Sequence, residues 1–152
     1  MNSQIKERIK VAQKSAMRTR DKQRLSCLRS ILAECKRFEI DERAQLSDHR
    51  ILVLMDKMCK QRRESISQFE AAGREDLVAI ERYEICVIQE FMPDSLSTAQ
   101  VHQLLDSAIA TTGATSMRDM KTVMELLKPQ LQGRADMGTV SRQIQAQLTS
   151  QT

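Results

Sequence analysis

Residues 116–148 read SMRDMKTVMELLKPQLQGRADMGTVSRQIQAQL and form the most informative segment of the chain. Apolar residues recur at helical spacing in two runs, from Met120 to Leu127 and from Met137 to Leu148. Pro129 predicts the end of the first helix and Asp136 a cap for the second. The segment therefore predicts two short helices joined by a tight loop. It contains no recognisable catalytic apparatus, so we expect its function to be binding.

Composition favours helix throughout the chain. Only four glycines and two prolines interrupt 152 residues, and Leu, Ile, Met, Ala, Gln, Lys, Arg and Glu predominate. We therefore expect an all-α protein, divided at Pro93 into an N-terminal four-helix domain (1–92) and a C-terminal three-helix bundle (93–152). Capping residues and glycines predict helix starts at Ser3, Asp21, Ser47, after Gly73, and at Ser97, Ser116 and Asp136.

Two features of packing can be predicted from these patterns. The fourth helix is expected to turn one apolar stripe inward, formed by Leu77, Ile80, Val87, Ile88 and Phe91. In the C-terminal loop, Gly133 is expected to let the backbone turn and Gly138 to let the last helix approach closely.

The cysteine pattern argues against a metal site. The four cysteines form no Cys-x-x-Cys pair, so we expect reduced core thiols, no metal and no cofactor.

The chain shows neither a secretory signal nor an apolar run of ~20 residues that would cross a membrane. Its basic, amphipathic first turns would also suit a transit peptide, but they fit the core of the first domain. We therefore expect a cytoplasmic protein.

Charge is concentrated in the N-terminal domain. Residues 1–92 hold 19 Lys and Arg against 15 acids, whereas residues 93–152 hold five of each. The cluster Lys60-Gln-Arg62-Arg63 could bind phosphate, although Arg62 falls on the inward stripe of its helix and predicts an ion pair with Glu81 or Glu84. We expect the two histidines, His49 and His102, on the surface.

Several segments together resemble the GatB/YqeY family along nearly the whole chain. They are Arg24-Leu-Ser-Cys-Leu-Arg29, Glu39-Ile-Asp-Glu-Arg43, residues 60–69 leading into Ala72-Gly-Arg-Glu-Asp-Leu77, Lys128-Pro, Gly133-Arg-Ala-Asp-Met-Gly138 and the final helix. The resemblance implies a C-terminal domain similar to the tail of the B subunit of glutamyl/aspartyl-tRNA amidotransferase, a region that helps to hold tRNA. The family is described as amidotransferase-like, a carbon-nitrogen ligase with glutamine as amide donor.

The resemblance implies an accessory protein of tRNA-dependent amidation or translation that binds tRNA or amidotransferase subunits through its tail. The expected contacts are Lys128, Arg134 and Arg142, with Lys60 and Arg63 as a second basic surface. The alternative is a protein–protein adaptor that binds no nucleic acid. A third hypothesis, an amide-transferring enzyme, stays open although no catalytic residues are recognisable. The chain departs from the common family pattern by lacking lysine at three positions: Thr122, Gln130 and Thr139.

Overall fold

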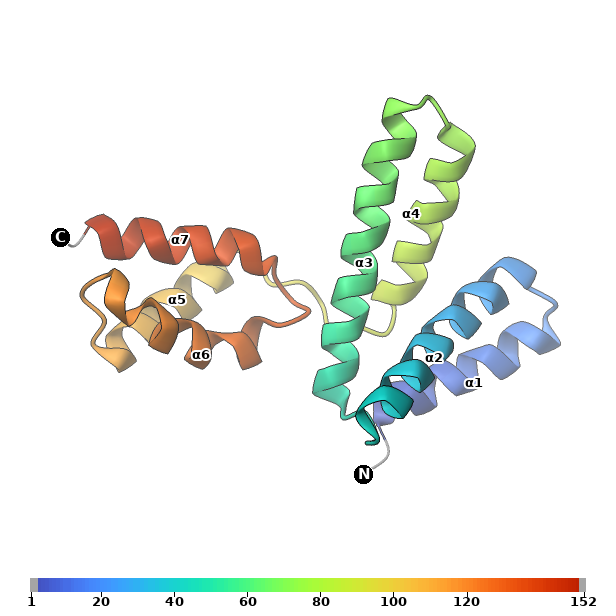
Figure 1. Cartoon of the computed structure of the whole chain (residues 1–152), viewed down its shortest axis with the longest axis horizontal. Coiled ribbons are helices and arrows are strands. Elements are labelled where there is room, and N and C mark those ends of the chain that lie inside the picture. Colours follow the sequence, from blue (N-terminus) through green and yellow to red (C-terminus); the bar gives the residue numbers. More distant parts are fainter. Residues whose placement is uncertain (1–2, 151–152) are drawn as a thin grey trace. The chain divides into compact units, whose positions relative to one another are not determined.

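A computed structural model describes residues 3–150 and confirms the all-α class (Figure 1). Within these residues the chain forms seven α-helices and one short 3-10 helix, and no strand. Contacts divide the chain into two compact units, Met1–Pro93 and Asp94–Thr152, here called the N-terminal and C-terminal units. Each unit has its own hydrophobic core. Among the described residues, no helix combines the length and apolarity needed to cross a membrane.

The N-terminal unit consists of two antiparallel helix pairs (Figure 1). The first pair is α1 (Gln4–Arg18) and α2 (Lys22–Glu42), and the second is α3 (Asp48–Ala71) and α4 (Glu75–Gln89). Apolar side chains from all four helices meet in one core, whose most deeply buried members include Ile9, Leu28, Ile31, Ile51, Met55 and Ile88.

Local capping chemistry fixes the helix starts of this unit as predicted. The side chains of Ser3, Asp21 and Ser47 each accept a hydrogen bond from a backbone N–H in the first turn of the helix that follows. At the other end of α3, Gly73 takes the left-handed conformation with φ +70°. A side chain is strained in that conformation, so glycine allows the chain to reverse into α4.

The C-terminal unit packs three helices around a separate core. They are α5 (Thr98–Thr112), α6 (Met120–Leu131) and α7 (Met137–Ser150), with the 3-10 helix η1 (Met117–Asp119) leading into α6. The core contains Leu105, Val123, Leu127, Leu131, Val140, Ile144 and Leu148. The predicted capping boxes, Ser97 with Gln100 and Ser116 with Asp119, are both present.

Two predictions about these helices are wrong. Pro129 does not end α6, which continues to Leu131. Proline removes one backbone donor, but Leu131 is fully buried and its packing holds the last turn in place. Gly138 does not mediate a close approach, because a Cβ there would meet nothing nearer than Asp136 Oδ1 at 3.7 Å. Gly133, in contrast, has φ +76° and makes the predicted turn.

The inward face of α4 also differs from the prediction. Ile80 is 45% exposed, whereas its neighbour Val78 is 1% exposed and belongs inside. Residues two apart lie about 200° apart around a helix, so Val78 and Ile80 cannot share a face. The inward side runs through Val78 and Ile88 and places Glu81 and Glu84, both half-buried, on or beside it. The apolar pattern did not indicate this face because part of it is polar.

Candidate nucleic-acid interface

The cations predicted from the sequence occupy both units. Lys128 is exposed in the last turn of α6, Arg142 is exposed on α7, and Arg134 is half-buried in the loop between them. Lys60 and Arg63 are exposed on α3 of the N-terminal unit. No ion pair engages Lys60, Arg63 or Lys128 within residues 3–150, so their charges are available to a phosphate.

Arg134 has a structural role that the sequence did not reveal. Its carbonyl oxygen accepts a hydrogen bond from Leu96 N at 2.8 Å, and its Nε donates to Asp94 O at 3.4 Å. Its own N–H donates to Leu131 O at 2.9 Å. Arg134 therefore fastens the segment that precedes α5 to the loop after α6. The sequence predicts an RNA contact for its side chain, and that stays a prediction; in the structure the Nε–H of this side chain is hydrogen-bonded to the protein backbone.

Asp136 immediately precedes α7 and interacts with a second predicted cation, Arg142. Its carboxylate accepts a hydrogen bond from Thr139 Oγ1 at 2.6 Å and a longer one from Gly138 N at 3.4 Å. The Thr139 hydroxyl is the main cause that lowers the pKa of Asp136, and the Arg142 charge adds to it. Arg142 Nη2 also donates to Thr139 Oγ1 at 3.3 Å. The nearby carboxylate therefore offsets part of the Arg142 charge.

The Arg62 ion pair is confirmed, and its partner is Glu84. Arg62 Nε donates to Glu84 Oε2 at 2.8 Å, and the Arg62 side chain is only 14% exposed. Burial, followed by the Glu84 charge, raises the pKa of Glu81, which lies one turn away. Within the cluster Lys60-Gln-Arg62-Arg63, Arg62 thus links α3 to α4, whereas Lys60 and Arg63 face solvent.

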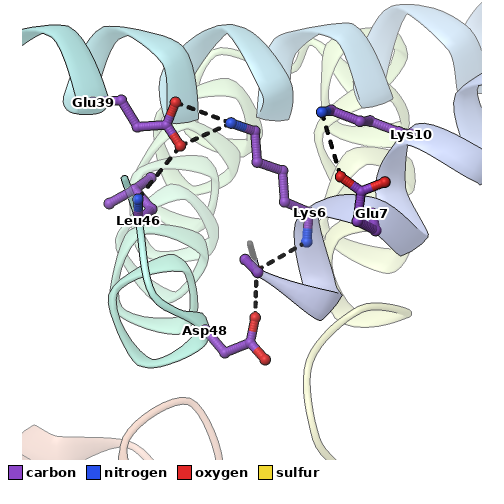
Figure 2. A network of polar contacts seen from close by, with 7 residues as sticks. Lys6, Glu7, Lys10, Glu39, Leu46 and Asp48 are labelled. Carbon is purple, nitrogen blue, oxygen red and sulfur yellow. Dashed lines mark hydrogen bonds and ion pairs between the residues drawn. The ribbon is translucent and has the colours of Figure 1, made fainter. Parts of the chain in front are cut away.

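A second polar network anchors the start of α1, as Figure 2 shows. Lys6 Nζ contacts both carboxylate oxygens of Glu39, at 2.7 and 2.9 Å, and Glu39 also accepts a hydrogen bond from Leu46 N. The Oγ of Ser3 donates to Asp48, which also accepts from Ile5 N at 3.2 Å. These contacts join α1 to α2 and to the first turn of α3. We interpret the network as structural, since its charges pair with one another.

The cysteine and histidine side chains, which are often used in catalysis, divide into a buried and an exposed set. Cys27, Cys35 and Cys59 are buried and Cys86 is exposed. Burial raises the pKa of Cys27 and of Cys35 to about 11, so both remain thiols at neutral pH. His49 and His102 are exposed as predicted. Across residues 3–150, no group of three or more His, Cys, Asp or Glu side chains could hold a metal ion.

A groove between α2 and α3 was not predicted from the sequence. It has a volume of about 530 Å³ and an apolar floor that includes Phe38, Leu54 and Met58. Its rim carries the ion pairs Arg37–Glu34 and Arg50–Glu42, together with Lys57. Its lining residues come from two helices, so no local sequence pattern indicates the groove.

Comparisons with known proteins agree on one family. The family model described as "Yqey-like protein" matches residues 6–148. Several relatives bear the name "Altered inheritance of mitochondria protein 41, mitochondrial". One from Eremothecium gossypii is 40% identical over 98 residues, 64% of this chain and 53% of that protein. One from Saccharomyces cerevisiae S288c is 32% identical over 119 residues, 73% of this chain and 63% of that protein. One from Pyrenophora tritici-repentis is 29% identical over 141 residues, 91% of this chain and 77% of that protein. The match thus spans about half the length of the Eremothecium relative.

Proposed function

This chain belongs to the YqeY-like protein family, and on that basis we propose that it is a tRNA-associated accessory protein with no chemistry of its own. The observation that carries the proposal is the exposure of Lys60, Arg63 and Lys128, which no carboxylate neutralises within the part of the chain that the structure describes. Exposed Lys and Arg side chains supply the electrostatic part of RNA affinity by replacing the counterions of phosphate groups.

The proposal includes the expected similarity of the C-terminal unit to the amidotransferase tail. In this unit Lys128 and Arg142 are the proposed RNA contacts, and Arg134 supports them by fixing the loop through Asp94 and Leu96. The unit carries no net charge, so we expect it to position the bound RNA more than to attract it electrostatically.

We further propose a mitochondrial location in place of the cytoplasmic one expected from the sequence. Its support is the printed name of the relatives, which calls each of them mitochondrial. Fractionation of cells that express the full-length protein tests this location. We expect the protein in the mitochondrial fraction, resistant to added protease until the membranes are opened. Recovery in the cytosolic fraction alone would contradict it.

Filter binding of total tRNA at 50 and 200 mM salt tests RNA association. The three contacts Lys60, Arg63 and Lys128 contribute about 20–40-fold to the fall in affinity between these salt concentrations. The triple variant Lys60→Gln, Arg63→Gln, Lys128→Gln should lose this contribution. Lys121→Gln serves as a control, because Lys121 already lies 4.0 Å from Glu125. Binding to tRNA no tighter than to polyglutamate at 50 mM salt would end the proposal.

The groove between α2 and α3 favours a second candidate, a protein–protein adaptor. Val53 lines the groove and is 41% exposed, and an apolar floor with a charged rim is typical of sites that receive an amphipathic helix. A pull-down after nuclease treatment tests this candidate. It should recover a stoichiometric protein with the native chain and with Ile40→Asp, an exposed position outside the groove lining, but not with Val53→Asp.

A further inference from the structure

The turn between α1 and α2 concentrates positive charge at one end of a helix pair. Four cations, Lys14, Arg18, Arg20 and Lys22, occur within nine residues, and all four side chains are exposed. The turn that carries them is tight, because Arg20 N donates to Met17 O at 3.3 Å and Asp21 N to Ala16 O at 3.0 Å. The end of α1 and the start of α2, which carry these cations, therefore form the tip of the hairpin. Arg29 adds a fifth exposed cation two turns further along α2.

The protein does not neutralise this charge. Residues 8–33 contain a single acid, Asp21, whose carboxylate caps α2 by accepting from Arg24 N at 3.1 Å. Arg24 itself is committed to Glu90 at 2.9 Å. Of residues 3–150, none forms an ion pair with the four cations at the tip. Each of them can therefore contact an external anion without breaking an internal bond.

Arg20 has an unusual backbone conformation for an arginine. Its backbone is left-handed, with φ 56°, where glycine or asparagine is the usual residue. An arginine at such a position strains the backbone, and its side chain forms no hydrogen bond or ion pair that compensates within the described chain. Folding alone therefore gives no reason for a long cationic side chain here.

The same hairpin is poorly suited to a membrane. A helix that lies on a bilayer inserts its apolar face, but Ile5, Ile9 and Ala16, the apolar face of α1, are buried in the protein core. The tip itself offers one large apolar side chain, Met17, which is 53% exposed. A convex, cationic tip with little exposed apolar surface fits the phosphate backbone of a nucleic acid better than a lipid surface.

We propose that the tip of the α1–α2 hairpin, formed by Lys14, Arg18, Arg20 and Lys22, binds the phosphate backbone of RNA. This inference rests on the proposed function for the choice of RNA as the polyanion. It adds a contact site in the N-terminal unit that is separate from Lys60, Arg63 and Lys128. Because its contacts are with phosphates, the site contributes affinity without recognising base sequence.

Two variants with the same net charge test the site. The hairpin variant carries Lys14→Gln, Arg18→Gln, Arg20→Asn and Lys22→Gln. The control variant carries Lys36→Gln, Arg43→Asn, Lys57→Gln and Arg118→Gln, which are also exposed. Each removes four charges from a chain of net charge +4. Arg43 matches Arg20 because it too is left-handed, with φ 53°. Circular dichroism first verifies that both variants are folded.

The readout is the slope of log K against log salt for tRNA binding between 50 and 200 mM. Four phosphate contacts contribute about 3 to that slope, so the hairpin variant should show a slope shallower by about 3. Its affinity at 50 mM should fall at least about tenfold, whereas the control should stay within about twofold of the native chain. Sedimentation with vesicles containing anionic phosphatidylglycerol should show no difference between the two variants.

The other outcomes separate the two proposals. If the hairpin variant binds tRNA like the control while the triple variant Lys60→Gln, Arg63→Gln, Lys128→Gln loses affinity, the hairpin site is overturned and the proposed function stands. If the hairpin variant keeps tRNA affinity but loses vesicle binding, the tip binds lipid and the inference is wrong. If the native chain does not bind tRNA at 50 mM salt, both proposals fall together.

Discussion

Breaking the Lys6–Glu39 pair should destabilise the N-terminal unit by a measurable and pH-dependent amount. The two side chains are 22% and 21% exposed, and Lys6 contacts both carboxylate oxygens of Glu39. Exposed pairs contribute about 0.2–1 kcal/mol, and hydrogen bonds to charged groups about 1.5–3 kcal/mol. Because water still screens this pair, we place the coupling free energy between the two residues at about 1–1.5 kcal/mol.

A double-mutant cycle isolates this coupling. Glu39→Gln removes the charge but keeps an acceptor for Leu46 N, and Lys6→Met removes the ammonium but keeps the apolar stem. Urea unfolding is followed by the fluorescence of Tyr83, which is the only tyrosine of a chain without tryptophan and lies on α4. The signal therefore reports the N-terminal unit even if the two units unfold separately.

The sign of the pH dependence follows from Glu39. The hydrogen bond from Lys6 is the main cause that lowers the pKa of Glu39 below its usual value of 4.5. A group with a lowered pKa in the folded state contributes stability that is fully present above its unfolded pKa and is lost as the pH falls through the folded value. The coupling should be constant from pH 7 to pH 6 and decrease as the pH falls below 4.5, the usual pKa of a glutamate. A coupling below 0.3 kcal/mol at pH 7, or an equal one at pH 3, would refute this reasoning.

Three further predictions concern single positions. Gly138→Ala should leave stability unchanged or raise it by up to about 1 kcal/mol, because the added Cβ meets no close neighbour. Gly133→Ala should lower stability by about 1 kcal/mol or more, because an alanine is strained at φ +76°. Thermal unfolding of the two variants compares these effects. Cys86 alone should react with a thiol reagent in the native protein at pH 8, and all four cysteines should react in denaturant; native reactivity of a buried cysteine would contradict the packing. Arg20→Gly should stabilise the N-terminal unit by about 0.5–1 kcal/mol by relieving the left-handed arginine, as measured by urea unfolding, and a loss of stability would mean that the Arg20 side chain contributes to the fold.

Helix starts and turns were predictable because their signals are local. Ser47 caps α3 through a hydrogen bond from the backbone N–H of Arg50, only three residues later. Gly73 makes its turn through its own left-handed backbone conformation. The all-α class followed from composition and spacing for the same reason. The Arg62 ion pair joins two helices, yet it was predictable because a charged residue on an inward stripe needs a partner on the helix opposite.

The errors arose where tertiary contacts override local patterns. Pro129 lies within α6 because buried packing at Leu131 outweighs the loss of one backbone donor. Ile80 is exposed because the inward face of α4 is partly polar, which no apolar stripe can indicate. A structural contact was also missed: Arg134 is hydrogen-bonded to Asp94 and Leu96, about 40 positions earlier in the chain, and no sequence motif indicates that contact.

If the chain binds RNA as proposed, the two units contribute unequally to its affinity. The C-terminal unit carries equal numbers of acids and bases. With one N–H of Arg134 hydrogen-bonded to Asp94 O and the charge of Arg142 partly offset by Asp136, Lys128 is the predicted tail cation whose side chain has neither a hydrogen bond nor a nearby carboxylate partner among residues 3–150. One phosphate contact changes affinity only about threefold between 50 and 200 mM salt. A strong salt dependence would therefore have to originate in the N-terminal unit, at the hairpin tip and at Lys60 and Arg63. If so, the C-terminal unit can determine where on an RNA the protein binds, but the N-terminal unit determines how tightly.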